Sequence, residues 1–375
     1  METLTAVDLF AGAGGLSLGL KLAGFNVCAA VEIDAVARDT HKANFPKAKL
    51  FNDVLTVTAT ELRAACGGQK PSLVAGCAPC QGFCSLTVKN KNEDPRNKLL
   101  LRMAELISEL KPDAVMMENV PGLQTRGEEI FAEFIGTLEG LGYPARKAWK
   151  IVQMADYGIP QSRRRLVMLV GKGFEIPFPE PTHAKRPGPD SNLQPWKTLR
   201  HAIGQRKFPV TLKEAKRKGG PRVHNWHVVR DLQPQVAARL AAALPGKTWL
   251  QVDEAIRPKC HRGEYDGFTN VYQRMAWKQT PVTITGGCTT SCKGRFGHPD
   301  RRRTTISVLE AAIIQTFPED YVFMTEHMES VCDMIGNAVP PEFARIAGEH
   351  ILAALKDRKE TSKSGPRFSA KRVRK

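Results

Sequence analysis

Short apolar runs alternate with segments of helical periodicity along the first half of the chain. Apolar runs at residues 5–10 and 27–32 predict buried strands. Helices are predicted at residues 15–23 and 34–44, the second with Asp34 as a cap for its first turn. This alternation is typical of crossover units on a mostly parallel sheet with helices on both faces. The sequence therefore predicts an α/β fold.

The same pattern continues for another hundred residues. Apolar runs at residues 73–75, 114–117 and 165–170 predict three further strands. Between the first two runs, apolar residues at helical spacing predict a helix with one buried face, formed by Leu99, Leu100, Met103, Leu106, Ile107 and Leu110.

Two of these runs end in side chains that can react. Residues 73–75 lead into a tight turn with a thiol, Ala78-Pro79-Cys80-Gln81-Gly82-Phe83, and residues 114–117 lead into Glu118-Asn119-Val120-Pro121-Gly122. We expect both segments at the carboxyl edge of the sheet, where open α/β sheets place their ligands. A thiol beside a carboxylic acid indicates covalent catalysis with acid assistance.

The alternation of strands and helices stops near Phe174. Residues 176–195 are rich in proline, which cannot continue a helix or an interior strand, so they are expected to form a linker. An irregular, basic region follows, and Ser307 with Glu310 then forms a capping box before a helix at residues 311–317. A last helix is expected at residues 341–355.

These elements predict a discontinuous large domain interrupted by a small one. The large domain is expected to comprise residues 1–180 and 300–357, and the inserted domain residues 181–299. Residues 358–375 are expected to form a basic, disordered tail, for which a solvated extension and a binding role are equally consistent with the sequence.

Charge adds an expectation about partners. The 375 residues carry 55 Lys and Arg against 38 Asp and Glu, a formal net charge of +17. Residues 197–230 hold ten basic residues and one acid, Glu214, which favours a surface that faces phosphates. No stretch reaches the roughly 18 consecutive apolar residues that a membrane span needs. Nine cysteines without a short-domain framework predict reduced thiols in a cytosolic or nuclear setting.

A glycine loop after the first strand indicates a nucleoside site. Residues 8–15, Asp-Leu-Phe-Ala-Gly-Ala-Gly-Gly, open the first helix, where the backbone can approach a ligand closely. Glu32 ends the second strand, a position suited to ribose hydroxyls. Asp8 disfavours a phosphate and suits an ammonium group. A nucleoside that carries an amino acid, such as S-adenosylmethionine, satisfies both acids, although a glycine loop alone does not identify a ligand.

Taken together, six blocks in order resemble the DNA (cytosine-5) methyltransferase family of the bacterial restriction-modification type. The resemblance covers nearly the whole chain and implies a Rossmann-like S-adenosylmethionine-dependent methyltransferase fold with an inserted target-recognition domain. The blocks are residues 8–20, 31–34, 79–81, 118–120, Gln161-Ser162-Arg163-Arg164-Arg165 and Gly336-Asn337-Ala338-Val339-Pro340.

The resemblance implies a role for each catalytic residue. Cys80 would attack carbon 6 of a cytosine as a thiolate, and Glu118 would bind or protonate ring nitrogen 3. Carbon 5 would then take the methyl group of S-adenosylmethionine, and loss of its proton would release the thiolate. Arg163 and Arg165 would hold the base, its phosphate and Glu118 through their forked donors. The target nucleotide would have to swing out of the duplex.

The resemblance also implies the residues that bind cofactor and DNA. Phe10 would pack on adenine, Glu32 would hold the ribose and Asp53 would reach the adenine amine. The cofactor-binding set is Asp8, Phe10, Gly12, Gly14, Glu32, Ile33, Asp53, Val54, Pro79, Leu99 and Asn337. The substrate-binding set is Gln81, Asn119, Gln161, Thr283, Tyr272, Arg274 and Arg295, with Gln273 and residues 301–303 as further candidates.

Three features of the sequence bear on how the DNA is bound. Asn119 and Gln161 would fix loop geometry, and the pair Thr283-Ile284 resembles the family's Thr-Leu pair. Residues 87–98, polar and directly after the thiol, are expected to form a lid over the flipped nucleotide. The target sequence itself cannot be deduced from the chain.

Departures from the family pattern leave every reacting group in place, and two rival functions stay open. Residues 76–79 read Gly-Cys-Ala-Pro where the family has Gly-Gly-Pro-Pro, and Leu309 stands where an arginine is usual. One rival is a tRNA methylase, whose Cys-Phe-Thr signature is absent because Gly267 precedes Phe268-Thr269. The other is a catalytically inactive DNA-binding regulator, which the retained Cys80 argues against. No metal site is expected.

The resemblance gives partners and location as well. The expected partner is double-stranded DNA, with a restriction endonuclease as a functional counterpart and no membrane. The protein is expected to be a monomer in the cytoplasm of a bacterial or archaeal cell or to be encoded by a phage.

Overall fold

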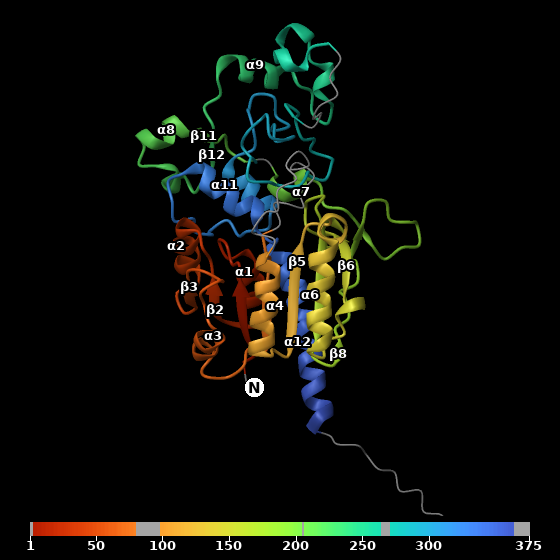
Figure 1. Ribbon diagram of the computed structural model, residues 1–375. Helices are drawn as coiled ribbons and strands as arrows, with labels where there is room; N and C mark the ends of the chain where they lie inside the picture. Colours follow the sequence, from red (N-terminus) through yellow and green to blue (C-terminus); the bar gives the residue numbers. More distant parts are fainter. Residues whose placement is uncertain (1–2, 80–97, 205, 264–270, 364–375) are drawn as a thin grey trace, which may run out of the picture.

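A computed structural model describes residues 3–79, 98–204, 206–263 and 271–363 (Figure 1). Its centre is an eight-stranded sheet in the order β3-β2-β1-β4-β5-β7-β6, with β8 paired to β7. The strands β1 to β5 pair in parallel, and β7 runs antiparallel to β5, β6 and β8. The strands are β1 (Thr5–Leu9), β2 (Asn26–Val31), β3 (Lys49–Phe51), β4 (Leu73–Gly76), β5 (Ala114–Asn119), β6 (Trp149–Gln153), β7 (Arg164–Gly171) and β8 (Phe174–Glu175).

Helices cover both faces of the sheet because strand residues alternate between them. Val7, Val74 and Val115 belong to one core, with side chains of α3 (Ala59–Ala65), α4 (Lys98–Leu110) and α6 (Glu128–Gly140). Ala6, Leu73 and Ala114 belong to the core on the other face, with α1 (Gly15–Ala23) and α12 (Pro341–Lys363). This arrangement confirms the predicted α/β fold with helices on both faces.

A third core holds the inserted region, which lies beyond the carboxyl ends of the parallel strands, opposite the N-terminus (Figure 1). It combines Ala13 and Phe45 from the glycine-loop side of the sheet with Ile284 and Phe296 of the insert. The other elements within the described residues are α2 (Ala35–Asn44), α5 (Leu123–Arg126), β9 (His183–Ala184), β10 (Gln194–Pro195), α7 (Leu199–Ile203), β11 (Val210–Thr211), α8 (Leu212–Arg217), β12 (Val228–Val229), α9 (Pro234–Ala242), α10 (Val308–Ile314), α11 (Met328–Asn337) and short 3-10 helices at Ala145–Lys147, Met154–Tyr157, Pro221–His224, Trp249–Gln251, Glu254–Ile256 and Lys259–His261.

Local signals located the helix starts well. The Asp34 carboxylate accepts from the backbone N–H of Ala37 at 2.7 Å, as the cap prediction required. The capping box of Ser307 and Glu310 is present, and α10 begins at Val308 instead of residue 311. The expected end of the last helix at residue 355 was wrong, because α12 continues to Lys363, past the predicted start of the tail at residue 358. Residues 364–375 lie outside the described part.

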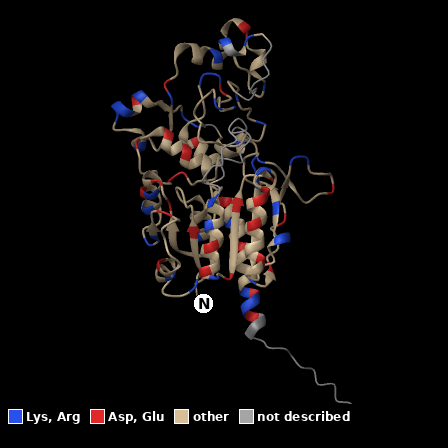
Figure 2. Ribbon diagram, in the orientation of Figure 1, with Lys and Arg blue, Asp and Glu red and all other residues tan. Residues whose placement is uncertain are grey.

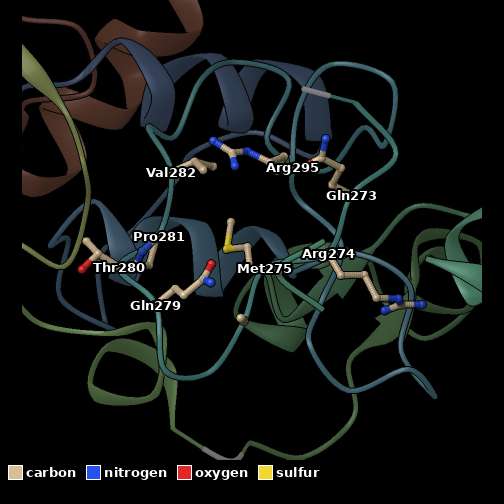
Figure 3. Close-up of a pocket in the computed structure, with 10 residues that line it drawn as sticks. Gln273, Arg274, Met275, Gln279, Thr280, Pro281, Val282 and Arg295 are labelled. Atoms are coloured by element: carbon tan, nitrogen blue, oxygen red, sulfur yellow. The ribbon is translucent and has the colours of Figure 1, made fainter. Parts of the chain in front are cut away.

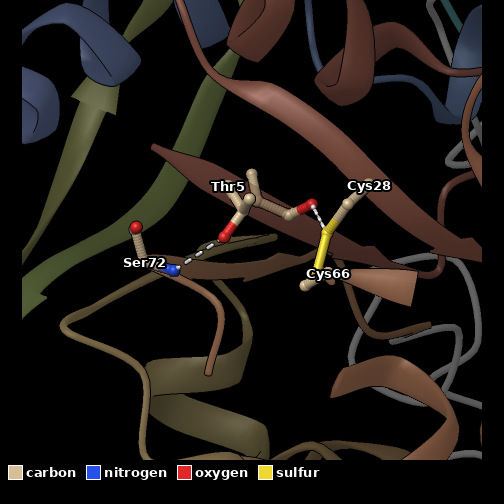
Figure 4. The surroundings of a disulfide bond; sticks show 5 residues. Thr5, Cys28, Cys66 and Ser72 are labelled. Atoms are coloured by element: carbon tan, nitrogen blue, oxygen red, sulfur yellow. Dashed lines mark hydrogen bonds between the residues drawn. A yellow bond between two sulfur atoms is a disulfide. The ribbon is translucent and has the colours of Figure 1, made fainter. Parts of the chain in front are cut away.

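The expectation that the cysteines are reduced thiols was wrong for one pair. Cys28 of β2 and Cys66, directly after α3, form a disulfide with a Cα–Cα separation of 5.3 Å (Figure 4). The expectation rested on the odd number of cysteines and the lack of a short-domain framework, whereas the fold brings together two cysteines 38 positions apart in sequence.

No helix in the described part of the chain is long and apolar enough to cross a membrane.

Two glycines inside helices make a matched test of helix packing. A Cβ built at Gly19 of α1 would collide with Ala344, Pro341 and Arg345, because α1 and α12 cross there. A Cβ at the exposed Gly136 of α6 would meet nothing within 4 Å. Helix propensity alone favours alanine by about 1 kcal/mol at either site. We therefore expect Gly136→Ala to raise the free energy of unfolding slightly and Gly19→Ala to lower it by about 1–3 kcal/mol through overpacking.

Urea denaturation followed by circular dichroism measures both variants. Equal stabilisation by the two substitutions would contradict the tight crossing of α1 and α12.

Candidate active site

Acidic side chains gather at the carboxyl edge of the parallel strands. Asp8 lies in β1, Glu32 directly follows β2, Asp53 follows β3, and Glu118 lies near the end of β5. The order of the strands reverses between β1 and β4, the position at which open α/β sheets form a ligand crevice. The structure thus brings the predicted cofactor and catalytic acids to one edge.

The two predicted residues of the nucleophile turn, Cys80 and Gln81, lie outside the described residues. The chain is described up to Pro79, and the residue before it is held in place. The Asn119 side-chain amide donates to the carbonyl of Ala78 at 3.2 Å. This bond ties the segment that leads to Cys80 to the end of β5, as expected for a residue that fixes loop geometry. Of the predicted lid at residues 87–98, only Lys98 is described, as the first residue of α4.

Glu118 and Arg165 form an ion pair at the sheet edge. Arg165 Nε lies 2.9 Å from Glu118 Oε1, and the side chains are 15% and 8% exposed respectively. In the antiparallel pairing of β5 with β7, Glu118 lies opposite Val167, two residues from Arg165, so the two side chains project from adjacent strands on the same face of the sheet. A shielded guanidinium at this distance orients the carboxyl group. This is the contact with Glu118 that the sequence predicted for Arg165.

Arg163 binds backbone carbonyls of distant segments. It is buried, and its guanidinium donates to the carbonyl of Ile284 at 3.0 Å and to those of Gly336 and Ala338 at 3.2 Å each. These carbonyls belong to the insert, to the end of α11 and to the turn before α12. Arg163 therefore joins these segments to the start of β7.

Gln161 and Thr283 reinforce the same junction. Gln161 Oε1 accepts from the backbone N–H of Ile284 at 2.9 Å, and its amide nitrogen donates to Gln315 Oε1 at 2.6 Å. The Thr283 hydroxyl donates to the carbonyl of Ser162 at 2.7 Å. Both residues therefore hold the insert against the start of β7. The sequence did not indicate a role for Gln315, because that role depends on its contact with Gln161, which is distant in sequence.

The cofactor side is built around Glu32 and the glycine loop. The carboxylate of Glu32 accepts from the backbone N–H of Gly12 at 2.7 Å and from that of Asp34 at 2.8 Å. A carboxylate has about four acceptor positions, so two stay available for ribose hydroxyls. Gly12 and Gly14 have positive φ, and a Cβ at Gly14 would lie 2.5 Å from Phe45 Cε2. Glycine is therefore required at Gly14.

The other predicted cofactor residues surround this loop. Phe10 is half-buried and has a φ of 66°, Val54 is buried, and Asp53 accepts from the backbone N–H of Leu55 at 2.9 Å. Ile33 is 72% exposed, which leaves an apolar side chain without cover at the rim. Pro79 and Leu99 are half-buried, and Asn337 is exposed.

An orphaned atom shows that these residues fit S-adenosylmethionine. Asp8 is wholly buried, and its Oδ1 has no hydrogen-bond partner among the described residues. Burial raises the pKa of Asp8 to about 7, and the nearby Glu32 carboxylate raises it further, whereas the hydrogen bond from Ser17 lowers it. A ligand ammonium group supplies the missing charge. A Cβ built at Gly12 meets nothing within 4 Å, so the loop has room beside it.

The structure separates the predicted DNA-binding arginines into two groups. Arg274 is 2% exposed, and its nitrogens donate to backbone carbonyls of residues that include Leu240 and His298, so it has a structural position and not the one expected for a base contact. Arg303 is buried in an ion pair with Glu310 at 2.8 Å. Arg302 pairs with Asp300 at 2.6 Å.

Arg295 differs from these. It is exposed, and no hydrogen bond or ion pair joins it to another described residue. It lines a pocket with Gln273 and Gln279 (Figure 3). Tyr272 is half-buried and makes an edge contact with His261, with ring centroids 5.8 Å apart.

The buried position of Arg163 predicts a large effect on stability. In Arg163→Lys a single ammonium cannot reach three carbonyls, and hydrogen bonds to a charged group contribute about 1.5–3 kcal/mol each. We expect the free energy of unfolding to fall by about 2–4 kcal/mol. Arg302→Lys is the control, because its exposed pair with Asp300 is screened by solvent and contributes little to stability. Thermal denaturation compares the variants, and equal melting temperatures would contradict the role of Arg163 at the junction.

Comparisons with known proteins agree with this geometry. The family model described as C-5 cytosine-specific DNA methylase matches residues 4–353. The chain is 35% identical over 355 residues to the Type II methylase M.HgiDII of Herpetosiphon aurantiacus, a match that covers 93% of this chain and 95% of the relative. It is 32% identical to the Type II methyltransferase M.XorII of Xanthomonas oryzae pv. oryzae, covering 94% and 86%.

Solved structures share the fold. A putative DNA modification methyltransferase encoded within an E. coli prophage superposes with a TM-score of 0.70 at 24% identity, covering 95% of this chain and all of the other. A mutant of Spodoptera frugiperda DNMT2 gives a TM-score of 0.61 at 18% identity, covering 94% and 100%. The match of the family model over almost the whole length, together with relatives above 30% identity, shows that the chain belongs to the C-5 cytosine-specific DNA methylase family.

Proposed function

We propose that this DNA methyltransferase modifies carbon 5 of cytosine within one specific double-stranded sequence and uses Cys80 as its nucleophile. The observation that carries the proposal is the ion pair of Glu118 with Arg165, 2.9 Å apart at the end of β5. The Asn119–Ala78 hydrogen bond fixes the segment before Cys80 to the same strand end. The oriented carboxyl group of Glu118 and the segment that leads to Cys80 therefore lie at the same edge of the sheet.

The reaction follows from these positions. The Cys80 thiolate adds to carbon 6 of the cytosine ring, while Glu118, oriented by Arg165, hydrogen-bonds or protonates nitrogen 3 and draws electron density from the ring. Carbon 5 thereby becomes nucleophilic. S-adenosylmethionine, when bound, supplies an electrophilic methyl group on a sulfonium ion. Loss of the proton from carbon 5 then expels the thiolate and restores the aromatic ring.

Cys77 is three residues from the proposed nucleophile and is unsuited to replace it. Burial raises the pKa of its thiol well above the usual value, and the nearby Glu118 and Asp8 carboxylates raise it further. A thiol with a raised pKa stays protonated and is a poor nucleophile.

The inserted region is proposed to hold the DNA. Chemistry at carbons 5 and 6 needs the target base outside the stack, at a cost of a few kcal/mol. Lys and Arg residues occur on α8 and at several places in the insert (Figure 2), where they can offset phosphate charge. Binding to basic side chains weakens steeply with salt.

Arg295 is the proposed reader of a base edge. It is exposed and unpaired within the described residues, whereas Arg274 and Arg303 are engaged inside the protein. Arginine reads guanine through two parallel hydrogen bonds. The neighbouring pocket residue Val282 bridges to Ser162, three positions before Arg165, so the pocket is linked directly to the catalytic edge.

We further propose that the chain works as a monomer in the cytoplasm and is paired with a restriction endonuclease. The pairing is supported by the relatives named as Type II methylases and methyltransferases.

Substitution of Cys80 tests the reaction. We expect Cys80→Ser to abolish methylation and to leave cofactor binding intact, since the serine hydroxyl is far less acidic than a thiol. Cys292→Ser is the matched control, because Cys292 is an exposed free cysteine in the insert. Bisulfite sequencing of DNA from a methylation-free host should show modified cytosines at one recurring motif with the wild type and the control only. Methylation by Cys80→Ser would refute the nucleophile assignment, and unmodified DNA with the soluble wild type would favour an RNA substrate.

Substitution of Arg295 tests the reading of DNA. A bidentate contact to guanine is worth about 1–3 kcal/mol, so Arg295→Ala should lower kcat/KM on the target duplex by about tenfold to a hundredfold. Arg302→Ala is the control, because that exposed arginine already pairs with Asp300. Steady-state methylation of the target duplex distinguishes them. Equal losses in the two variants would count against a reading role for Arg295.

A further inference from the structure

A chain of three buried side chains leads away from the cofactor loop. Asp8, Ser17 and His41, from β1, α1 and α2, are each 0% exposed. The Ser17 hydroxyl donates to Asp8 Oδ2 at 2.6 Å, and Ser17 Oγ lies 3.0 Å from His41 Nε2. Neither Ser17 nor His41 was singled out by the sequence as part of a site.

The direction of the hydrogen bonds follows from proton counting. Ser17 has one proton and gives it to Asp8, so its oxygen must accept from His41 Nε2. Burial lowers the pKa of His41 to about 4, which keeps the ring neutral with its one proton on Nε2. The hydrogen bonds therefore all point in one direction: His41 donates to Ser17, and Ser17 donates to Asp8. Each donor stabilises negative charge on the Asp8 carboxylate.

We propose that Ser17 and His41 are positioning residues that keep Asp8 ionised and leave its Oδ1 free for the ammonium group of the cofactor. The proposal rests on the use of S-adenosylmethionine by this family and adds two residues that do not touch the cofactor themselves. Its first support is the asymmetry of the carboxylate. Oδ2 is taken by Ser17, whereas Oδ1 is buried and has no hydrogen-bond partner within the described residues.

Packing joins these residues to the glycine loop. A Cβ at Gly14 would lie 2.9 Å from the Tyr321 hydroxyl and 3.1 Å from His41 Cδ2. The Tyr321 hydroxyl donates to the carbonyl of Ala13. The glycine loop thus packs directly against His41 and Tyr321, so a substitution of either residue is expected to alter the position of the loop.

The groups around Asp8 leave room for a cation. Glu32 at the end of β2 acts on Asp8 as a second acid and raises its pKa. Cys77 after β4 and Tyr321 beside the loop are neutral, because burial and the Asp8 charge raise the pKa of each. His41 from α2 is neutral, and Ser17 from α1 carries no charge. Two acids with neutral neighbours form a site that a ligand ammonium group would complete.

The same geometry makes cofactor binding depend on pH. An ammonium group binds the carboxylate form of Asp8, whose pKa in the free protein is about 7. Affinity is therefore full above that pH and falls, up to tenfold per pH unit, as Asp8 of the free protein takes up a proton below it. Removal of a donor raises the pKa of Asp8 and moves this fall to higher pH.

Isothermal titration calorimetry with two ligands tests the proposal. S-adenosylhomocysteine carries the amino acid, whereas 5′-methylthioadenosine is the same nucleoside thioether without it. For the wild type we expect S-adenosylhomocysteine to bind roughly tenfold more weakly at pH 6 than at pH 7.5, with methylthioadenosine unaffected. Ser17→Ala should shift the midpoint upward, and His41→Phe, which keeps a ring against Phe45, should shift it by less.

Binding of methylthioadenosine to each variant shows that the site is folded. A flat pH profile for S-adenosylhomocysteine, an equal profile for methylthioadenosine, or unchanged midpoints in both variants would overturn the proposal. These outcomes are independent of methyl transfer, so DNA methylation by the wild type would still stand if the proposal failed.

Discussion

A single buried guanidinium, that of Arg163, joins the three parts of the chain that form the site. It bonds to the carbonyls of Ile284 in the insert and of Gly336 and Ala338 before α12, while its own residue immediately precedes β7. The ion pair of Arg165 with Glu118 begins two residues further along. Because a buried charge without its partners is costly, these contacts must form together. The position of the insert over the catalytic edge is thus coupled to the folding of the sheet.

The edge of the sheet places two acids, Asp8 and Glu118, in different electrostatic surroundings. Asp8 and Glu118 are both buried acids, and within the described residues an ion pair with an arginine is present at Glu118 and not at Asp8. Asp8 instead accepts a hydrogen bond from the Ser17 hydroxyl and lies near a second acid, Glu32. Burial keeps the Cys77 thiol protonated by raising its pKa, and the charges of Glu118 and Asp8 raise that pKa further. In the proposed mechanism the ammonium group of the cofactor pairs with Asp8, whereas Arg165 of the protein pairs with Glu118.

Sequence patterns predicted what depends on neighbours in the chain. The α/β fold followed from alternating periodicity, and the starts of α2 and α10 followed from Asp34 and Ser307, whose caps need only the next turn. The sequence could not separate arginines by their surroundings. Arg274 was expected at the DNA and is enclosed by carbonyls, because that depends on a packing between distant segments. The Cys28–Cys66 bond and the Ser17–His41 contact were missed for the same reason.

The central claim is that Cys80 forms the covalent bond to the target base, and a trapped adduct tests it most directly. In a target duplex that carries 5-fluorocytosine at the modified position, the fluorine on carbon 5 cannot leave as a proton, so the thiolate stays attached after methyl transfer. Tryptic mass spectrometry of the complex formed with S-adenosylmethionine should locate the nucleotide on Cys80. An adduct on Cys77, three residues away, or methyl transfer to the fluorinated duplex without any adduct would contradict the account.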